Sequence, residues 1–440
     1  MGEYLALVMF PALLTALFLG FPVAFSMMGI ALFFGLATFG SPVIFQFVQK
    51  VDAVATAFEL AAVPLFIFMG AMMERSGMAE RLFEAIHLWT RRLPGGLAVG
   101  TVVMCVVFAA SSGVIGATET VVGMLAIPVM MKYAYDKGLI SGTICAGGSL
   151  GTIIPPSVVV VVLGPVADVS VGTLFVGMIF PGLILAALYV SYILGWCALN
   201  PKAGPSLPRS DDDPSFLEKT RISLIALWPP VAMIIAVLGS IMFGLAAPTE
   251  AAGLGALGAL LLTLVYRQFS IPVLHEALLK TLRVTCMIFM ILLGGNMFAG
   301  VFIASGGVTL TERLIAEAAL SPGFTLALFL LVCFIAGFFL DWISVLLIFI
   351  PVFIPIVKSM GFDPAWFCIL FLIVIQTSYL TPPMAPAIFY LRGISPPEIT
   401  LRHMFQGVVP FIILQIICLA IVAAFPALVL WLPDQLLGFR

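Results

Sequence analysis

Long apolar runs follow one another along almost the whole chain and are separated by short polar breaks. Many of these runs approach 20 residues, the length that an α-helix needs to cross the hydrocarbon core of a bilayer. The pattern therefore predicts an all-α, polytopic membrane protein with about ten full crossings. The predicted crossings cover residues 4–20, 22–39, 54–73, 139–164, 170–198, 222–245, 248–266, 281–303, 364–391 and 405–431.

Two further apolar segments are interrupted near their centres. Residues 95–131 are broken around 111–116, and residues 323–357 contain the acidic residue Asp341. Each half of such a segment is too short to cross alone, because a crossing needs about 20 residues. We therefore predict two re-entrant helical hairpins that turn back inside the membrane.

Two charged segments carry apolar side chains at helical spacing. In residues 75–92, the apolar positions Leu82, Phe83 and Ile86 share one face of a helix, and residues 309–320 show a similar pattern. Both segments are too polar to cross, so we expect amphipathic helices that lie along the membrane surface.

The chain consists of two similar halves joined by a polar stretch. Residues 200–221 are predicted to be a cytoplasmic linker between repeat 1 (1–199) and repeat 2 (222–440). Several proline and glycine anchors recur in the two halves at spacings of 223 to 228 positions. We predict that each half crosses the membrane an odd number of times, so the second half is inverted relative to the first.

The distribution of basic residues predicts how the chain is oriented. If both termini lie outside the cytoplasm, fifteen of the 19 Lys and Arg residues fall on the cytoplasmic side and four on the outer side. Basic residues are strongly enriched in cytoplasmic loops. We therefore expect both termini to be periplasmic, and the two hairpins to enter from opposite faces with their tips near the midplane.

The crossings 139–164 and 364–391 each contain a Pro-Pro pair, Pro155-Pro156 and Pro382-Pro383. Proline removes amide donors and clashes with the preceding turn, and the glycines before the first pair weaken that helix further. A broken helix at membrane depth is tolerated only where it is packed in protein or lines a cavity, and there it can bind an ion. We expect the two breaks to form the working site.

Hydroxyl, amide and freed backbone oxygens gather at these breaks and at the hairpin tips. Such oxygens suit an alkali cation, whereas zinc and copper prefer imidazole or thiolate, and the N-termini of half-helices suit a carboxylate. We therefore expect a Na⁺ site and an organic-anion site side by side. The predicted Na⁺ ligands are Ser111, Ser112, Gly113, Ser149, Gly151, Thr152, Ile154, Asp341, Gln376, Thr377, Ser378 and Thr381, and the predicted substrate residues are Pro156, Ser157 and Pro383.

Each of these residues also has a structural interpretation. Small residues such as Ser and Gly permit close packing of membrane helices. An aspartate such as Asp341 can cap a helix or pair with a nearby donor. The acidic residue Glu119, in the second arm of the first hairpin, also needs a reason to lie in an apolar segment.

Composition excludes several classes of protein. The chain is 62% hydrophobic and 9% charged, whereas soluble proteins carry about 25% charged residues. Its seven cysteines form no C-x-x-C pair, so we expect small buried apolar side chains rather than a zinc site or disulfides. The sequence has no phosphate-binding G-x-x-x-x-G-K-[ST] loop and no plausible catalytic set. We therefore expect no enzyme activity, no cofactor and no nucleic-acid partner.

Five short stretches together match the pattern of a known family. They are FELAAVPLFIFMG at 58–70, SSG at 111–113, IPPS at 154–157, TPP at 381–383 and FYLRG at 389–393. Over nearly the whole chain the sequence resembles the large membrane subunit of the tripartite ATP-independent periplasmic (TRAP) transporters. The resemblance implies a Na⁺-driven importer of carboxylates or related organic anions in the bacterial inner membrane. It also implies an elevator mechanism, a small four-helix membrane subunit and a soluble periplasmic substrate-binding protein.

Two other functions remain open at this point. The chain could be a stand-alone symporter or exchanger of a related inverted-repeat fold that needs no binding protein. It could also be an ion channel, which requires a continuous pore and conducts much faster than a transporter.

Overall fold

The computed structural model describes residues 2–113, 116–207 and 214–438, and over these residues it contains helices and no strands. A helix satisfies its own backbone donors and acceptors, which lipid cannot do. The predicted all-α fold class is therefore confirmed. The helices are α1 (Gly2–Phe18), α2 (Val23–Phe39), α3 (Pro42–Thr56), η1 (Phe58–Ala61), α4 (Ala62–Glu74), α5 (Met78–Thr90), α6 (Gly96–Ser112), α7 (Ala117–Lys132), α8 (Lys137–Ser149), η2 (Leu150–Thr152), α9 (Val158–Ala167), α10 (Val171–Gly177), α11 (Ile179–Leu199), α12 (Phe216–Ile234), η3 (Ile235–Gly239), α13 (Ser240–Met242), α14 (Pro248–Val265), α15 (Ile271–Ala304), α16 (Gly307–Glu317), α17 (Pro322–Ala336), α18 (Trp342–Ser359), α19 (Pro364–Leu380), α20 (Pro386–Ile394), α21 (Leu401–Ala424) and α22 (Ala427–Leu437).

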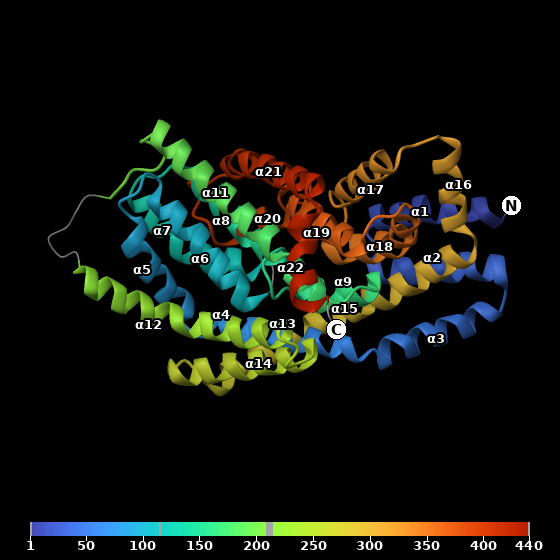
Figure 1. The fold of residues 1–440 in the computed structure, drawn as a ribbon, viewed down its shortest axis with the longest axis horizontal. Coiled ribbons are helices and arrows are strands. Elements are labelled where there is room, and N and C mark those ends of the chain that lie inside the picture. Colours follow the sequence, from blue (N-terminus) through green and yellow to red (C-terminus); the bar gives the residue numbers. More distant parts are fainter. Residues whose placement is uncertain (1, 114–115, 208–213, 439–440) are drawn as a thin grey trace.

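The helices of the second half follow those of the first in the same order. Helix α8 begins at Lys137, and α19 begins 227 positions later at Pro364. The amphipathic helices α5 and α16, the helix pairs α6–α7 and α17–α18, and the short helices α9 and α20 correspond in the same way. Figure 1 shows α5 to α8 toward one end of the molecule and α16 to α18 toward the other, with the long helix α15 reaching from the centre toward the N-terminal end. The short helices are exchanged between these groups, because α9 packs on α18 and α20 packs on α7 and α8.

The third, eighth and tenth crossings differ from their predicted bounds. The polar residues near Lys50 lie on helix α3, which is bent by 54° relative to the following η1 and α4. The bend falls at Ala57, whose extended backbone (φ −68°, ψ 99°) ends α3 before η1 begins. Helix α15 begins at Ile271 rather than 281, and the predicted last crossing is divided at Phe425 into α21 and α22.

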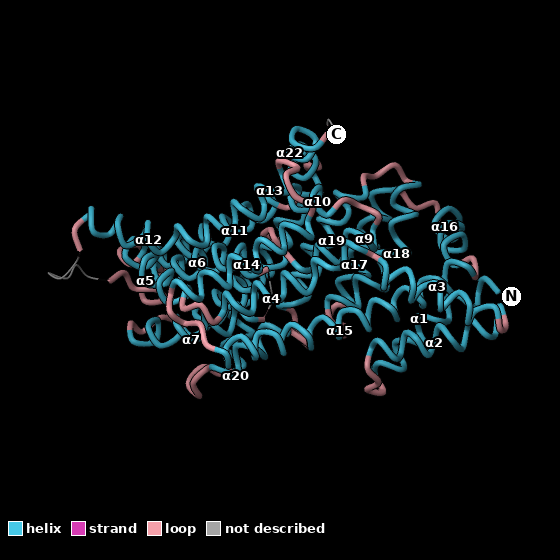
Figure 2. The backbone as a smooth tube through the Cα atoms, turned by 90° about the horizontal axis from the view of Figure 1, so that it is seen from below, coloured by secondary structure: helices cyan, strands magenta, loops and turns pink. Residues whose placement is uncertain are grey.

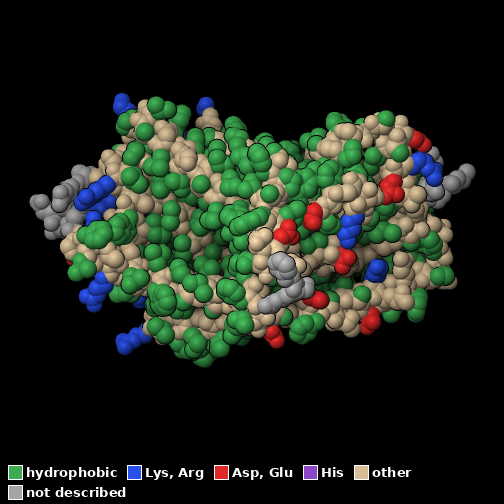
Figure 3. All heavy atoms as spheres, in the orientation of Figure 1, with side chains coloured by type: hydrophobic (Ala, Val, Ile, Leu, Met, Phe, Trp, Pro, Cys, Tyr) green, Lys and Arg blue, Asp and Glu red, His purple; other side chains and the backbone are tan. Residues whose placement is uncertain are grey.

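Six of the described helices are long and apolar enough to cross a membrane, or seven if the bent pair of α3 and α4 counts as one span. Several shorter apolar helices accompany them. On the face shown in Figure 3, hydrophobic side chains cover the middle of the molecule, and Lys and Arg gather at the end formed by α5, α7 and α12. These features identify a multi-pass membrane protein, whereas the number of crossings stays a prediction.

The early helices of the two halves pack against one another across the repeat. Helix α2 packs on α15, and α4 packs on both α14 and α15. Ion pairs Lys280–Glu74 and Arg75–Glu276 add to the contact between α4 and α15. Figure 2 shows α4, α14 and α15 side by side in a second view. This paired frame lies against the helices that carry the breaks.

Helices α8 and α21 approach closely because glycines line their contact. Gly138 and Gly142 are one turn apart on α8 and face Gly407 of α21, and a methyl group added at Gly142 or at Gly407 would overlap the opposing backbone. This small-xxx-small pattern is typical of tightly packed membrane helices.

Gly142→Ala is therefore expected to destabilise the protein by about 1–3 kcal/mol, the usual cost of overpacking. The measurement is thermal unfolding in detergent. Gly253→Ala is the matched control, because Gly253 of α14 has open space around its Cα. Equal melting temperatures for the two variants would contradict the close approach of α8 and α21.

His87, on the amphipathic helix α5, predicts a pH dependence of stability. Burial lowers the pKa of His87 to about 4 from an ordinary value of 6.5. The unfolded chain therefore binds a proton that the folded chain does not, and stability falls as the pH drops from 6.5 to about 4. The full loss is about 3 kcal/mol. Unfolding measured across this range is expected to show a smaller slope in His87→Gln, and the exposed His275→Gln is the control.

Six of the seven cysteines are buried, as the sequence predicted, but Cys286 is exposed on α15. Its surroundings on the outer face of a long apolar helix explain this, because that face is open in an isolated membrane chain. Among the residues that the structure describes, no group of three or more His, Cys, Asp or Glu side chains is placed to hold a metal ion.

Candidate functional site

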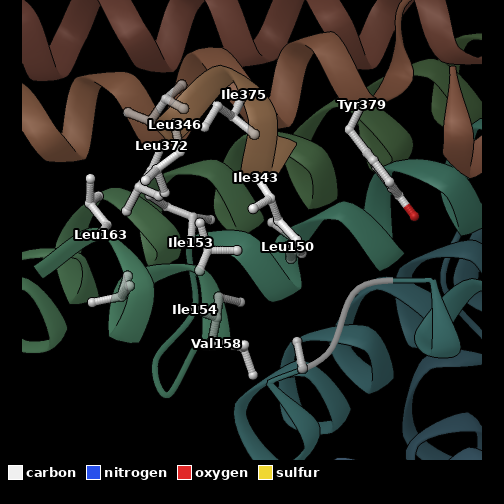
Figure 4. Packing of buried hydrophobic residues seen from close by; sticks show 14 of the residues in the cluster. Leu150, Ile153, Ile154, Val158, Leu163, Ile343, Leu346, Leu372, Ile375 and Tyr379 are labelled. Atoms are coloured by element: carbon white, nitrogen blue, oxygen red, sulfur yellow. The ribbon is translucent and has the colours of Figure 1, made fainter. Parts of the chain in front are cut away.

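The two helix breaks predicted from the sequence lie against each other at the centre of the molecule. Helix α8 ends at Ser149 and is followed by the single turn η2, while α19 ends at Leu380. Both Pro-Pro peptide bonds are cis. Figure 4 shows Leu372 and Ile375 of α19 packed over Ile153 of the first break. Apolar contacts therefore hold the breaks together and exclude water around their polar groups.

Ser149 and Gln376 join the two breaks directly. The amide Nε2 of Gln376 donates a hydrogen bond of 3.1 Å to the Ser149 hydroxyl, and Nε2 of Gln415 on α21 donates another of 3.4 Å. The hydroxyl itself donates to the Ala146 carbonyl at 2.8 Å. All three polar side chains are fully buried. Ser149 and Gln376 are 227 positions apart, the same spacing as the Pro-Pro pairs, so equivalent positions of the repeat touch.

The side-chain oxygen atoms of the two glutamines are available to bind a ligand beside Ser149. Oε1 of Gln376 and Oε1 of Gln415 are buried and have no hydrogen-bond partner. An unsatisfied buried acceptor costs about 1–3 kcal/mol, so it calls for a ligand such as a water molecule or an ion. Amide oxygens are suitable ligands for alkali cations, and two of them lie beside the freed backbone of the first break.

The hydroxyl groups of the predicted ion site share one arrangement. Each donates its proton to a carbonyl three or four residues earlier in the chain, so the lone pairs of the oxygen remain free to accept or to bind a cation. These bonds run from Ser111 to Phe108 (2.9 Å), Thr152 to Ser149 (2.8 Å), Thr377 to Ile373 (2.9 Å), Ser378 to Val374 (3.1 Å) and Thr381 to Thr377 (2.7 Å).

The tip of the first helix pair docks on the first break. The Gly113 carbonyl accepts a hydrogen bond of 3.2 Å from the amide of Val158, the first residue of α9. A methyl group at Gly113 would lie 2.8 Å from the Pro156 carbonyl, and its φ of 62° favours glycine. The tip therefore lies next to the predicted ligands Gly151 and Ile154, which are buried. The side chain of Ser112 lies outside the described residues.

Asp341 sits at the start of the second arm of the other helix pair and caps α18. Its carboxylate accepts from the amides of Ile343 (3.1 Å) and Ser344 (3.4 Å), and also from the Ser344 hydroxyl. This is the capping arrangement that the sequence left as the alternative. A role for Asp341 in cation binding stays a prediction.

Two cavities, of about 560 Å³ and 490 Å³, adjoin at the tips of the helix pairs. Both are in the size range of small-molecule sites. Asp341 and Ser378 line the first cavity, and Gly113 and Lys280 line the second. The residues that line both are Met287, Trp342, Ile343 and Tyr390. The cavities thus lie between the α4–α15 frame and the two tips.

The predicted substrate residues are not brought together. Pro156 and Ser157 are buried at the first break, and the Ser157 hydroxyl has no hydrogen-bond partner. Pro383 is exposed and lines a separate cavity of about 210 Å³ with Leu14 of α1 and Phe338. Pro156 and Pro383 hold equivalent positions in the two halves, but the three residues do not line one shared pocket.

Sequence reasoning missed Gln415 and the charged rim of the second cavity. Gln415 was a polar residue in an apolar crossing, which is the signal that could have found it. Arg75, Glu74 and Lys280 line the second cavity, and Nζ of Lys280 lies 2.6 Å from the Glu74 carboxylate. Glu119 is not among the predicted ligands, although it is fully buried beside the first break.

The arrangement can be compared with known proteins. The family model for the "Tripartite ATP-independent periplasmic transporter, DctM component" matches residues 10–428. The chain belongs to this family. A "C4-dicarboxylate TRAP transporter large permease protein" of Pseudomonas aeruginosa is 32% identical over 380 residues, which is 86% of this chain and 87% of that protein. An "Ectoine/5-hydroxyectoine TRAP transporter large permease protein" of Ruegeria pomeroyi is 30% identical and spans 98% of this chain and 99% of that protein.

A solved transporter structure shows the same fold for this TRAP large subunit. The YdaH transporter of Alcanivorax borkumensis aligns with a TM-score of 0.64 over 89% of both chains, at 14% identity. These relationships identify the chain as a membrane permease of a tripartite transporter. Its role is in transport rather than catalysis, and it works with other subunits.

Proposed function

We propose that this TRAP subunit forms the membrane path of a Na⁺-coupled importer of an organic anion, with a carboxylate as the substrate class. The contact between Ser149 and Gln376 carries the proposal. It joins the two repeat-related breaks and lies beside two buried amide oxygens without donors, which is ligand chemistry that suits an alkali cation. The anion would occupy the adjoining cavities, whose rim holds Arg75 and Lys280.

The partners we propose are a small four-helix membrane subunit and a periplasmic substrate-binding protein, with this chain in the bacterial inner membrane. The concentration of Lys and Arg at one end of the molecule supports an orientation with that end in the cytoplasm and both termini in the periplasm. The exposed apolar residues of α2, and those of α12 and α14, offer surfaces for lipid and for the small subunit.

For the transport step, we propose an elevator movement. The moving body would contain the two helix pairs and the two broken helices, and the frame would contain α2, α4, α14 and α15. The position of the cavities between these two groups supports this division. Each helix pair keeps its backbone hydrogen bonds internal, so it can move as a block without exposing unpaired groups to lipid.

The test is uptake into proteoliposomes that contain this chain and its small subunit, with the binding protein outside. Labelled C4-dicarboxylate and ectoine, the compounds named for its relatives, are the first substrates. Saturable uptake is expected only with an inward Na⁺ gradient, and replacing Na⁺ by choline is expected to stop it. Uptake that persists in choline would contradict Na⁺ coupling.

Two controls separate the competing functions. Robust uptake by this chain without the binding protein would favour a stand-alone symporter or exchanger. Single-channel currents in planar bilayers would favour a channel, because a continuous pore conducts far faster than a moving site.

A further inference from the structure

Glu119 is a buried carboxyl group to which the proposed Na⁺ and anion sites assign no role. It lies in the first turn of α7, just after the tip of the first helix pair, and its side chain is 0% exposed. Neither carboxylate oxygen makes a well-formed hydrogen bond, and the nearest donors are the Tyr379 hydroxyl and the backbone amides at the start of α7. A charged carboxylate in such a place costs several kcal/mol unless it is paired.

The groups around Glu119 offer no positive charge. The titratable groups near it are Cys105 of α6, Cys145 of α8, and two tyrosines, Tyr379 of α19 and Tyr390 of α20. Helix α5 also packs against α7 and carries His87. Burial alone lowers the pKa of His87, and Glu119 does not contribute to that shift. The described neighbours are therefore neutral groups, and none of them can neutralise a carboxylate.

Two opposing effects act on the charge of Glu119. The first turn of a helix favours a negative charge, because the amide dipoles point their positive ends toward it. Burial without a cation favours the neutral acid. Because the two effects oppose each other, a modest change in the surroundings, such as a movement of the helix pair, is sufficient to bind or release a proton.

The tyrosines link this carboxyl group to the cavities. The buried Tyr379 hydroxyl points to Glu119, and Tyr379 lines the first cavity. Tyr390 lines both cavities, and a methyl group at Gly116 would lie 3.1 Å from its ring. A proton from water in the cavities thus has a short route to Glu119 past two phenol groups.

Glu119 also rests on the first break. A methyl group at Gly148 would lie 2.6 Å from Oε1 of Glu119, so the carboxyl group touches the backbone one residue before Ser149. A negative charge on Glu119 would therefore lie close to a cation bound at Ser149. The surroundings have a low dielectric constant, so the attraction between the two charges would be strong.

We propose that Glu119 is a proton-binding site of the transport unit and that its protonation weakens cation binding at the neighbouring Ser149–Gln376 contact. The carboxylate accepts one proton from hydronium in the cavity to give the neutral acid and water. Protonation removes a negative charge from beside the cation, so the two cations compete and the effect is reciprocal. The coupling part rests on the proposed Na⁺ site, whereas the proton site itself does not.

The proton site is tested without any transport substrate. Infrared difference spectra of the purified chain, between about pH 5 and about pH 9, are expected to show the carbonyl band of a buried carboxylic acid. Glu119→Gln should remove this band, and Asp341→Asn should leave it. Tyr379→Phe, which keeps the ring, should shift the titration and provides a second variant if Glu119→Gln folds poorly. A titrating band that is undiminished in Glu119→Gln, or no such band in the native protein, would overturn the proposal.

The coupling is tested by ²²Na⁺ binding to the same preparations. The native protein is expected to bind Na⁺ at least tenfold more weakly at the acidic end of this range than at the alkaline end, and Glu119→Gln should bind weakly at all pH values. A native Na⁺ affinity that is independent of pH would overturn the coupling. Failure of any Na⁺ to bind, together with a normal infrared titration, would refute the proposed Na⁺ site and leave the proton site standing.

Discussion

Replacing Gln376 by leucine is expected to raise the Na⁺ concentration needed for half-maximal uptake by about tenfold to 100-fold. Leucine has a similar volume but lacks the amide that donates to Ser149 and the unpartnered Oε1. Loss of one partner of a buried polar pair costs about 1–3 kcal/mol, which corresponds to about that change in affinity. We expect the protein to fold, because Gln376 is surrounded by apolar side chains of α19.

A double-mutant cycle with Ser149→Ala tests whether the two residues act as one unit. If they hold the same ion, the double variant should be little worse than the worse single variant, because the second replacement removes an interaction that is already lost. Ser149→Ala combined with Thr152→Val should likewise weaken the Na⁺ dependence more than it weakens folding.

The matched control is Thr263→Val in α14. Thr263 is fully buried and donates to the carbonyl four residues earlier at 2.8 Å, as Thr377 does, but it lies away from the breaks. Its replacement should leave the Na⁺ dependence unchanged. Equal effects of Thr263→Val and Gln376→Leu would show that Gln376 supports only folding.

The length of the apolar runs and the positions of the proline pairs predict much of the fold. Apolar length predicts helices because lipid forces backbone groups to pair within a segment. The Pro-Pro pairs predict the ends of α8 and α19, since proline cannot continue a helix. The bend between α3 and η1 was missed because it falls at Ala57, an apolar residue that is compatible with a helix.

The site was less predictable, because it depends on which helices meet. The spacing of 227 positions identified Ser149 and Gln376 separately as candidates, but not the hydrogen bond between them. Gln415 reaches the same point from α21, and no local pattern connects that helix with the breaks. Pro383 lines a different cavity from the one expected, because equivalent positions in a repeat need not face the same cavity.

Asp341→Asn is expected to reduce Na⁺-driven uptake at least tenfold with little loss of stability. Asparagine caps helices about as well as aspartate, so the bonds to the amides of Ile343 and Ser344 can persist. The variant removes the negative charge that faces the first cavity. The measurement is the initial rate of uptake against Na⁺ concentration, together with thermal unfolding in detergent.

Two further variants separate charge from capping at this position. Asp341→Ala removes both, and its additional loss of stability should be about 1 kcal/mol, the cost of a lost cap. Asp363→Asn is the matched control, because Asp363 caps α19 through the amides of Ala365 (2.7 Å) and Trp366 (3.2 Å) and lines neither of the two adjoining cavities. If Asp341→Asn transports with the native Na⁺ dependence and stoichiometry while Asp341→Ala is merely less stable, the carboxylate serves only as a cap. Loss of coupling in Asp341→Asn alone would instead place its charge in the transport cycle, because the cap would still hold the tip of the second helix pair in place.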